Sequence, residues 1–168
     1  VISLADLAGQ WPIMRATQAL ADVADAACDA AVAYLFHAAE RKGDWLGDAG
    51  DTAPERGSGL IVLAMGKHGA RELNFSSDID LIVFYEREKA RRRDGLDPGQ
   101  FFIRLTRDLV KLLNDRTADG YVFRTDLRLR PDPGATQVAI STESALHYYE
   151  SVGQNWERAA MIKARPAA

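Results

Sequence analysis

Two short apolar runs, the second broken only by Asp80, place the tightest limit on how this chain can fold. Residues 60–65 read Leu-Ile-Val-Leu-Ala-Met, and residues 79–85 read Ile-Asp-Leu-Ile-Val-Phe-Tyr. Both runs are too short for a buried helix, and they are rich in residues that favour strands. A strand that is apolar on both faces is typical of the centre of a sheet covered by helices. The two runs therefore predict central strands joined by a short glycine-containing segment.

The rest of the chain carries helical and extended patterns in turn. Helical spacing or capping signals predict four helices, at residues 20–41, 101 to about 119, 142 to about 152, and 156–165. Alternation predicts two further strands, at residues 121–130 and 137–140. Glycine, proline and charged residues predict two loops, residues 43–59 and 86–100, and we expect the second loop to be mobile.

These elements predict an α+β fold in which helices flank a small mixed sheet, with one further helix at the N-terminus. Residues 1–58 are expected to form an N-terminal helical segment and linker, and residues 59–168 a compact core. A chain of 168 residues is long enough for one sizeable hydrophobic core. Because the chain starts at Val1 and not at a methionine, we expect it to be a fragment of a larger protein.

The composition argues against several kinds of partner. A net charge of -3 disfavours nucleic acid and anionic membrane surfaces, because both attract cationic proteins. Cys28 is the single cysteine and cannot form an internal disulfide, and its place in a helical pattern predicts a small core residue. The sequence has neither a signal peptide nor an apolar run long enough to cross a bilayer, so we expect a cytoplasmic protein.

The second apolar run is entered through an Asp-Ile-Asp sequence. Because side chains alternate along a strand, Asp78 and Asp80 project on one side while Ile79 and Leu81 enter the core. Neighbouring carboxylates repel each other, and a divalent cation is the simplest way to compensate their charge. An acidic edge with an open side suits Mg²⁺, which also binds water and phosphate oxygens, and Mn²⁺ can substitute. We therefore predict a metal site at these two aspartates.

The alternating segment 121–130 supplies a third carboxylate. Asp126 is expected to share one face of a strand with Arg124, Arg128 and Arg130. The three arginines can compensate the charge of a polyphosphate. We therefore predict a phosphoryl-transfer site in which Asp126 joins the other two aspartates as a catalytic, metal-binding residue.

Three residues between the two apolar runs are further candidates for contacts with nucleotide phosphate. Gly66 forms part of the turn after the first run. Lys67 can either contact phosphate or point into solvent, and the sequence does not separate these alternatives. Ser77 can either bind phosphate or cap the turn before Asp78, and these alternatives also stay open.

Three separated motifs resemble a known enzyme family. They read GKHGARELNFSSDIDL at 66–81, RTDLRLRP at 124–131 and GQNWERAAMIKAR at 153–165. The order of strand, Gly-Lys, Asp-Ile-Asp and later aspartate resembles the DNA polymerase β-like nucleotidyltransferase superfamily and implies its fold. Within that superfamily, the three motifs resemble the glutamine synthetase adenylyltransferase/adenylyl-removing enzymes. The sequence departs from the usual Leu-Gly-Gly of that family at 68–70, where it has His-Gly-Ala.

The resemblance implies a bifunctional parent enzyme. One half of it attaches AMP to a tyrosine of glutamine synthetase, and the other half removes AMP by phosphorolysis, with phosphate entering and ADP leaving. Residues 74–77 and 153–158 resemble the N-terminal, adenylyl-removing half. The implied partners are glutamine synthetase, ADP or ATP, phosphate, and a PII signal protein through the full-length enzyme. Three alternatives stay open: ATP-dependent adenylylation of glutamine synthetase, uridylylation of a PII-type protein, and a non-catalytic nucleotide-binding regulatory domain.

Overall fold

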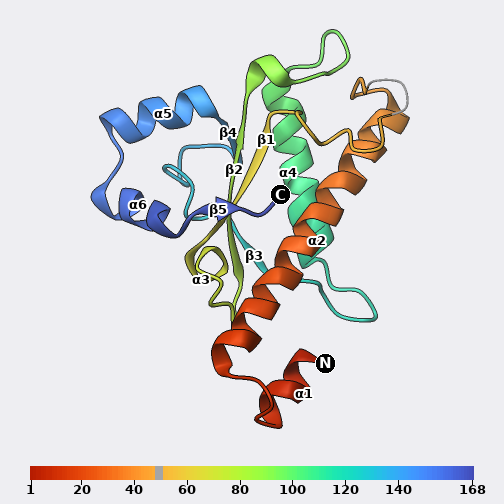
Figure 1. Cartoon of the computed structure of the whole chain (residues 1–168). Helices are drawn as coiled ribbons and strands as arrows, with labels where there is room; N and C mark the ends of the chain where they lie inside the picture. The colour runs from red at the N-terminus through yellow and green to blue at the C-terminus, as the bar shows by residue number, and fades with distance from the viewer. Residues whose placement is uncertain (48–50) are drawn as a thin grey trace.

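A small mixed sheet forms the centre of the computed structural model, which describes residues 1–47 and 51–168 (Figure 1). Strand β1 (Leu60–Met65) pairs antiparallel with β2 (Ile79–Tyr85) over most of its length. On its other edge β1 pairs antiparallel with β5 (Arg165–Pro166). Two short strands, β3 (Thr125–Asp126) and β4 (Ala139–Ser141), pair in parallel with successive parts of β2. The two apolar runs are thus confirmed as the central strands.

Helices cover both faces of this sheet (Figure 1). The described helices are α1 (Ile2–Leu7), α2 (Ile13–Lys42), α3 (Gly66–Gly69), α4 (Pro98–Asn114), α5 (Thr142–Ser151) and α6 (Asn155–Ala160), with 3-10 helices η1 (Arg87–Lys89) and η2 (Met161–Lys163). Helices α2 and α4 pack together on one face, whereas α5 and α6 lie on the other. The predicted α+β fold, with a small mixed sheet flanked by helices and an N-terminal helix, is therefore confirmed.

Helix α2 lies on the sheet with a stripe of mostly small side chains. Its buried residues are Ala16, Ala21, Ala24, Cys28, Val32 and Phe36. The core position predicted for Cys28 is confirmed, and burial raises the pKa of its thiol to about 12. The helix starts at Ile13, earlier than the predicted Leu20, in a part where few side chains are buried. None of the described helices combines the length and apolar character needed to cross a membrane.

An aromatic cluster fixes one end of the core. The Phe102 ring stacks on Tyr85 with centroids 4.9 Å apart, and the Trp45 ring stacks on Phe101 at 5.2 Å. Phe36 of α2 meets Trp45 edge-on at 4.9 Å. Stacked and edge-on pairs are the favourable arrangements of aromatic rings. The cluster therefore joins α2, the segment after it, α4 and β2 into one core.

The two segments predicted as loops are hydrogen-bonded to each other, and the segment 86–100, predicted as one loop, contains η1 and the first residues of α4. The backbone N–H of Leu46 donates to the carbonyl of Arg91 at 2.6 Å. Arg93 donates from its backbone N–H to the carbonyl of Asp44 at 3.1 Å and pairs with the Asp44 carboxylate at 3.4 Å. Part of the other predicted loop, residues 48–50, lies outside the described residues.

Helix α4 is offset from the predicted helix at both ends. It begins at Pro98 because the Asp97 side chain caps it, accepting a hydrogen bond from the backbone N–H of Gln100 at 2.9 Å. It ends at Asn114, well before residue 119. There the Leu113 carbonyl accepts hydrogen bonds from two backbone N–H groups of the returning chain, at 3.1 and 2.9 Å. The returning chain therefore takes the place of a further helical turn.

The predicted strand at 121–130 is reduced to Thr125–Asp126. After this strand the chain turns, because the Asp126 carboxylate accepts a hydrogen bond from the backbone N–H of Arg128 at 2.7 Å. The turn ends the alternation of side chains. As a result, Arg130 donates to two nearby backbone carbonyls at 2.9 and 2.8 Å, while its positive charge still lowers the pKa of the Asp126 carboxyl.

The predicted helix at 156–165 consists of several short elements. Helix α6 and η2 occupy its first part, and Arg165 begins β5. A capping box starts α6, in which the buried Glu157 carboxylate accepts a hydrogen bond from the backbone N–H of Gln154 at 2.7 Å. The same carboxylate accepts a hydrogen bond from the Tyr148 hydroxyl at 2.9 Å. Glu157 therefore joins α6 to α5 on the face of the sheet opposite α2 and α4.

Candidate active site

Three aspartates meet at the edge where β1 ends and β2 begins. The antiparallel register places Asp80 opposite the last residue of β1, and the parallel register places it beside Asp126. Asp78 directly precedes β2. One hollow at this edge is lined by Gly66, Lys67, Ser76, Ser77, Asp78, Asp80, Arg124, Asp126, Arg128 and Lys163. The structure thus gathers the three predicted carboxylates and most of the other predicted site residues, with Arg130 as the exception.

Asp80 has the least compensated negative charge of the three aspartates. Burial of its side chain raises the pKa of the carboxyl, and the negative charges of Asp126 and Asp78 raise it further. Arg128 and Lys67 lower the pKa but do not cancel these effects. The hollow therefore favours a bound cation or a proton at Asp80.

Two arginines partner the other aspartates. Arg128 places Nη2 at 2.5 Å and Nε at 2.8 Å from Oδ2 of Asp126, and these hydrogen bonds lower the pKa of that carboxyl. The Nε of Arg124 lies 2.5 Å from Oδ1 of Asp78, and its Nη2 donates to the Ser76 carbonyl at 2.7 Å. The side chains of Arg128 and Arg124 are 83% and 51% exposed, so each can change partner at small cost.

Gly66 brings the backbone of α3 directly against Asp80. Its φ of 53° lies in the left-handed region, where residues with a Cβ are strained. A Cβ at this position would lie 2.5 Å from Oδ2 of Asp80. The backbone conformation therefore favours a glycine, and a Cβ at this position would force the Asp80 carboxylate to move.

Gly66→Ala is expected to lower the free energy of unfolding by about 1–3 kcal/mol, because it adds both backbone strain and a steric clash. Urea unfolding of the variant and the unchanged chain measures this loss. Gly9→Ala is the matched control, since Gly9 has a φ of 66° but open space around its Cα. Equal losses in the two variants would mean that the contact with Asp80 contributes nothing.

Three further polar residues shape the hollow. The Ser77 hydroxyl donates to Oδ1 of Asn74 at 2.7 Å, which is the turn-closing alternative, although the side chain also lines the hollow. Lys67 is exposed and forms no ion pair within residues 1–47 and 51–168. Lys163 lies across from it on η2 and pairs with Glu72 at 3.5 Å. The sequence favoured a solvated position for Lys163 and left a minor phosphate role open through the third motif, and the structure places Lys163 at the hollow.

The donor groups suit a magnesium ion that is shared with a nucleotide. The described part of the chain contains no group of three His, Cys, Asp or Glu side chains placed to hold an ion unaided. Mg²⁺ does not need such a group, because it is commonly bound by one or two carboxylates together with water and substrate phosphates. Asp80 needs compensation, and the arginine partners of Asp78 and Asp126 are exposed. The residues present therefore fit the predicted ion.

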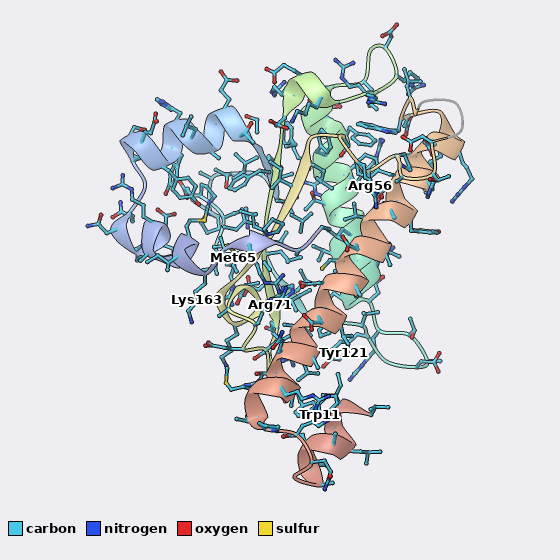
Figure 2. All side chains as sticks on the ribbon, in the orientation of Figure 1. Trp11, Arg56, Met65, Arg71, Tyr121 and Lys163 are labelled. Atoms are coloured by element: carbon cyan, nitrogen blue, oxygen red, sulfur yellow. The ribbon has the colours of Figure 1, made fainter. Side chains whose placement is uncertain are left out.

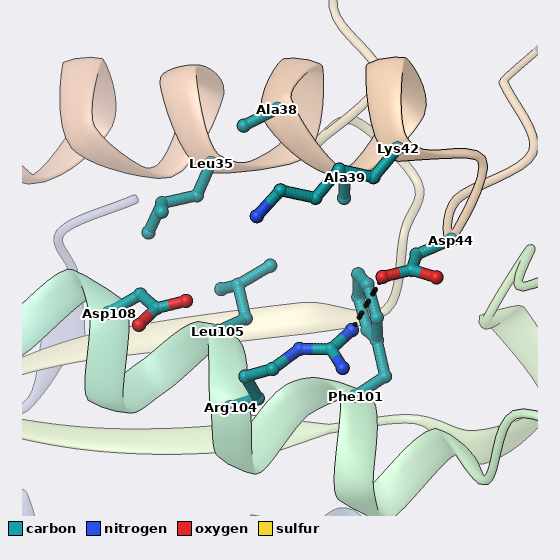
Figure 3. Close-up of a pocket in the computed structure, with 9 residues that line it drawn as sticks. All are labelled: Leu35, Ala38, Ala39, Lys42, Asp44, Phe101, Arg104, Leu105 and Asp108. Carbon is teal, nitrogen blue, oxygen red and sulfur yellow. Dashed lines mark hydrogen bonds and ion pairs between the residues drawn. The ribbon is translucent and has the colours of Figure 1, made fainter.

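A second hollow lies between α2 and α4, and its chemistry differs (Figure 3). Leu35, Ala39 and Leu105 are among the apolar residues that line it. At its rim the guanidinium of Arg104 donates to the Asp44 carboxylate at 2.9 Å. None of the predicted site residues lines this hollow. We therefore take the acidic hollow as the candidate active site.

The fold and the acidic edge define a nucleotidyltransferase-like domain: a mixed sheet between helices, with a glycine turn beside Asp-Ile-Asp and a third aspartate in register. The family can be stated more narrowly. The sequence model of the glutamate-ammonia ligase adenylyltransferase family matches residues 1–168, and the chain belongs to this family.

Curated relatives match the chain over its whole length. Proteins from Bradyrhizobium sp. (strain BTAi1 / ATCC BAA-1182) and Xanthobacter autotrophicus (strain ATCC BAA-1158 / Py2) are each 57% identical to the chain, and one from Rhodopseudomonas palustris (strain TIE-1) is 55% identical. Each is named a bifunctional glutamine synthetase adenylyltransferase/adenylyl-removing enzyme. Each alignment covers 100% of this chain but 17% of the relative. The family resemblance carried by the three motifs is confirmed.

Proposed function

We propose that this chain is a magnesium-dependent nucleotidyltransferase domain that removes AMP from an adenylylated tyrosine of glutamine synthetase. Inorganic phosphate is the second substrate and ADP is the product. One observation carries the proposal: Asp78, Asp80 and Asp126 line one hollow beside the Gly66 turn, in a chain of this family. The names of the relatives, which state both adenylyl transfer and adenylyl removal, support the choice of substrate.

The proposed reaction is a phosphorolysis. An oxygen of inorganic phosphate forms a bond to the phosphorus of AMP-tyrosine, and the bond from that phosphorus to the tyrosyl oxygen breaks. The phenolate leaves and takes a proton from solvent. Because the pKa of tyrosine is ordinarily about 10, a phenolate leaves far more readily than an alkoxide. The AMP-tyrosine bond is therefore reactive enough for phosphate to displace it.

In the proposed mechanism, the acidic residues of the hollow bind the metal and its arginines bind phosphate. Asp78, Asp80 and Asp126 would hold Mg²⁺, which supplies positive charge against the phosphate oxygens. Arg124 and Arg128 are exposed cations beside these carboxylates. When phosphate arrives, their guanidinium groups turn toward it and hold it in line with the departing tyrosyl oxygen.

Two lysines provide further positive charge around the hollow. Lys67 follows the Gly66 turn, and Lys163 lies on η2. A lysine acts toward phosphate as a mobile point charge, so these two residues suit the phosphates of the departing ADP. Arg130, which was predicted for the same task, is held by backbone carbonyls and has no part in the proposed mechanism.

The direction of AMP transfer rests on the family resemblance, because an acidic metal edge serves both directions equally. Residues 74–77 and 153–158 resemble the adenylyl-removing half. The first segment borders the hollow through Ser76 and Ser77, whereas the second forms the corner between α5 and α6. The direction is therefore the part of the proposal that most needs a direct test.

The test incubates this chain with adenylylated glutamine synthetase and measures ADP by chromatography. We expect ADP release only when phosphate and Mg²⁺ are both present. A parallel reaction contains unmodified glutamine synthetase, ATP and Mg²⁺. AMP transfer in that reaction, without phosphate-dependent ADP release in the first, would reverse the direction but keep the enzyme class. If the folded chain is inactive in both reactions, the proposed function is wrong.

A further inference from the structure

The turn that lines the acidic hollow cannot hold its own position. Helix α3 is a single turn of four residues, and one turn of helix is unstable by itself because few hydrogen bonds offset its ordering. Figure 2 shows this turn with Lys163 on one side and Arg71, toward α2, on the other. Side chains from α2 and β5 converge on it. These contacts decide where the turn lies.

His68 joins the turn to α2. Its side chain is fully buried, and its Nε2 lies 2.8 Å from Oδ1 of Asp25. Burial lowers the pKa of the imidazole, with the nearby carboxylate opposing this effect. The neutral ring therefore donates its Nε2 proton to the carboxylate, which fixes the tautomer.

Arg165 joins the same turn to β5. Its Nη2 donates to the His68 carbonyl at 3.0 Å, and its Nε donates to the Gly69 carbonyl at 3.1 Å. Its Nη1 donates to Oδ2 of Asp25 at 2.7 Å. The two oxygens of Asp25 are thus divided between His68 and Arg165. One carboxylate on α2 holds both the side chain of the turn and the arginine that binds the backbone of the turn.

Close backbone packing connects this cluster to the hollow. A Cβ on Gly69 would lie 2.1 Å from the carbonyl oxygen of Lys163 and 2.6 Å from that of Ala64. At the other end of the turn, Gly66 lies against the carboxylate of Asp80. The turn is thus packed against Lys163 and Ala64 at one end and against Asp80 at the other, so a displacement of the turn that follows loss of its support is passed on to the wall of the hollow.

We propose that Asp25 and Arg165 are positioning residues of the active site, which act by fixing the His68-containing turn against Asp80. This inference rests on the proposed function for its effect on nucleotide binding. The carboxylate of Asp25 does not line the acidic hollow. It acts through the turn, in the way that residues behind a metal site orient the groups in direct contact with the ion.

The test compares Asp25→Asn with Asp29→Asn. Asp29 lies one turn further along α2, is exposed, and has no hydrogen bond or ion pair with the turn among the described residues. Calorimetry measures the dissociation constant of ADP with Mg²⁺ for each variant. Asp25→Asn is expected to weaken binding roughly 10- to 100-fold, as is typical when a group behind a metal site is lost. Asp29→Asn is expected to bind as the unchanged chain does.

Hydrogen exchange supplies a second measurement that does not depend on the proposed function. In Asp25→Asn, exchange is expected to rise at the amides of Ala70 and Arg71, which donate to carbonyls of the turn, while β1 and β2 stay protected. Arg165→Lys keeps the cation for Asp25 but not the fork of donors, so it should loosen the same amides. If Asp25→Asn does not fold, Arg165→Lys takes its place as the test variant.

The two measurements separate failure of this inference from failure of the proposed function. If the unchanged chain does not bind ADP with Mg²⁺, the proposed function is in error, and local exchange at the turn alone decides the positioning role. If the exchange rates rise uniformly over the chain, Asp25 only stabilises the fold and the inference is overturned. The same conclusion follows if ADP binds equally to the Asp25→Asn variant and the unchanged chain.

Discussion

Asp80→Asn is expected to reduce the proposed AMP removal on the order of 1,000-fold, which corresponds to about 4 kcal/mol of lost transition-state stabilisation. The substitution removes the negative charge at the centre of the acidic edge while keeping the shape of the side chain. Because Asp80 is half-buried beside two other carboxylates, its replacement also relieves repulsion. The melting temperature should therefore stay the same or rise while the activity is lost.

The measurement combines phosphate-dependent ADP release with thermal unfolding of the same preparation. Asp108→Asn on α4 is the matched control, since it makes the same chemical change at an exposed site far from the acidic hollow. Normal turnover by Asp80→Asn at saturating Mg²⁺ would rule out the assigned metal edge. A lower melting temperature with proportionally lower activity would point to a structural role instead.

Phe102→Ala is expected to cost about 3–5 kcal/mol of the free energy of unfolding, the range for deletion of a buried aromatic ring. Phe102 is completely buried and stacks on Tyr85, with Phe101 meeting it edge-on at a centroid distance of 5.3 Å. The surrounding rings belong to different elements, so they cannot all collapse into the space left behind.

Urea denaturation followed by circular dichroism measures this loss. Leu112→Ala on the same helix is the control, because Leu112 is 43% exposed, and its truncation should cost roughly 0.5 kcal/mol. If Phe102→Ala unfolds the chain entirely, Phe102→Leu leaves a smaller gap and should give an intermediate loss. Similar losses for Phe102→Ala and Leu112→Ala would contradict the position of the core.

The central strands could be predicted to the residue because their signal is local. Each apolar run is bounded by residues that cannot continue it, with Gly66 after β1 and Asp78 before β2. The place of the acidic pair followed from the same runs, since alternation along a strand assigns each side chain to a face. Alternation did not place Asp126 beside this pair, because the adjacency of its strand to β2 was implied by the family resemblance and is given by the parallel register of β2 and β3.

The segment around β3 shows where local patterns fail. Its alternating arginines suggested a long strand, but the Asp126 side chain binds the backbone N–H of Arg128 and turns the chain. When a short polar side chain binds a backbone N–H and turns the chain, the spacing of apolar residues in the sequence does not reveal it. Sequence reasoning therefore identified Asp126 as the acidic residue of this segment but overestimated the length of its strand.

The cluster behind the active-site turn had no local signal. Asp25 lies 43 residues before His68 and 140 residues before Arg165. Within the α2 pattern, Asp25 reads as an ordinary polar residue of a helix, and Arg165 reads as the end of a charged helix. Only the packing of α2 and β5 around α3 shows that the three side chains form one unit.

The separation of Asp25 from Arg165 by 140 residues affects the order in which contacts form during folding. The β1–β2 pair joins neighbouring segments and can close early, whereas a contact across 140 residues carries a larger loop-closure entropy. We therefore expect the turn at Gly66 to take its final position only once α2 and β5 have both packed against it. During refolding, we therefore expect recovery of ligand-binding capacity to lag behind pairing of β1 with β2.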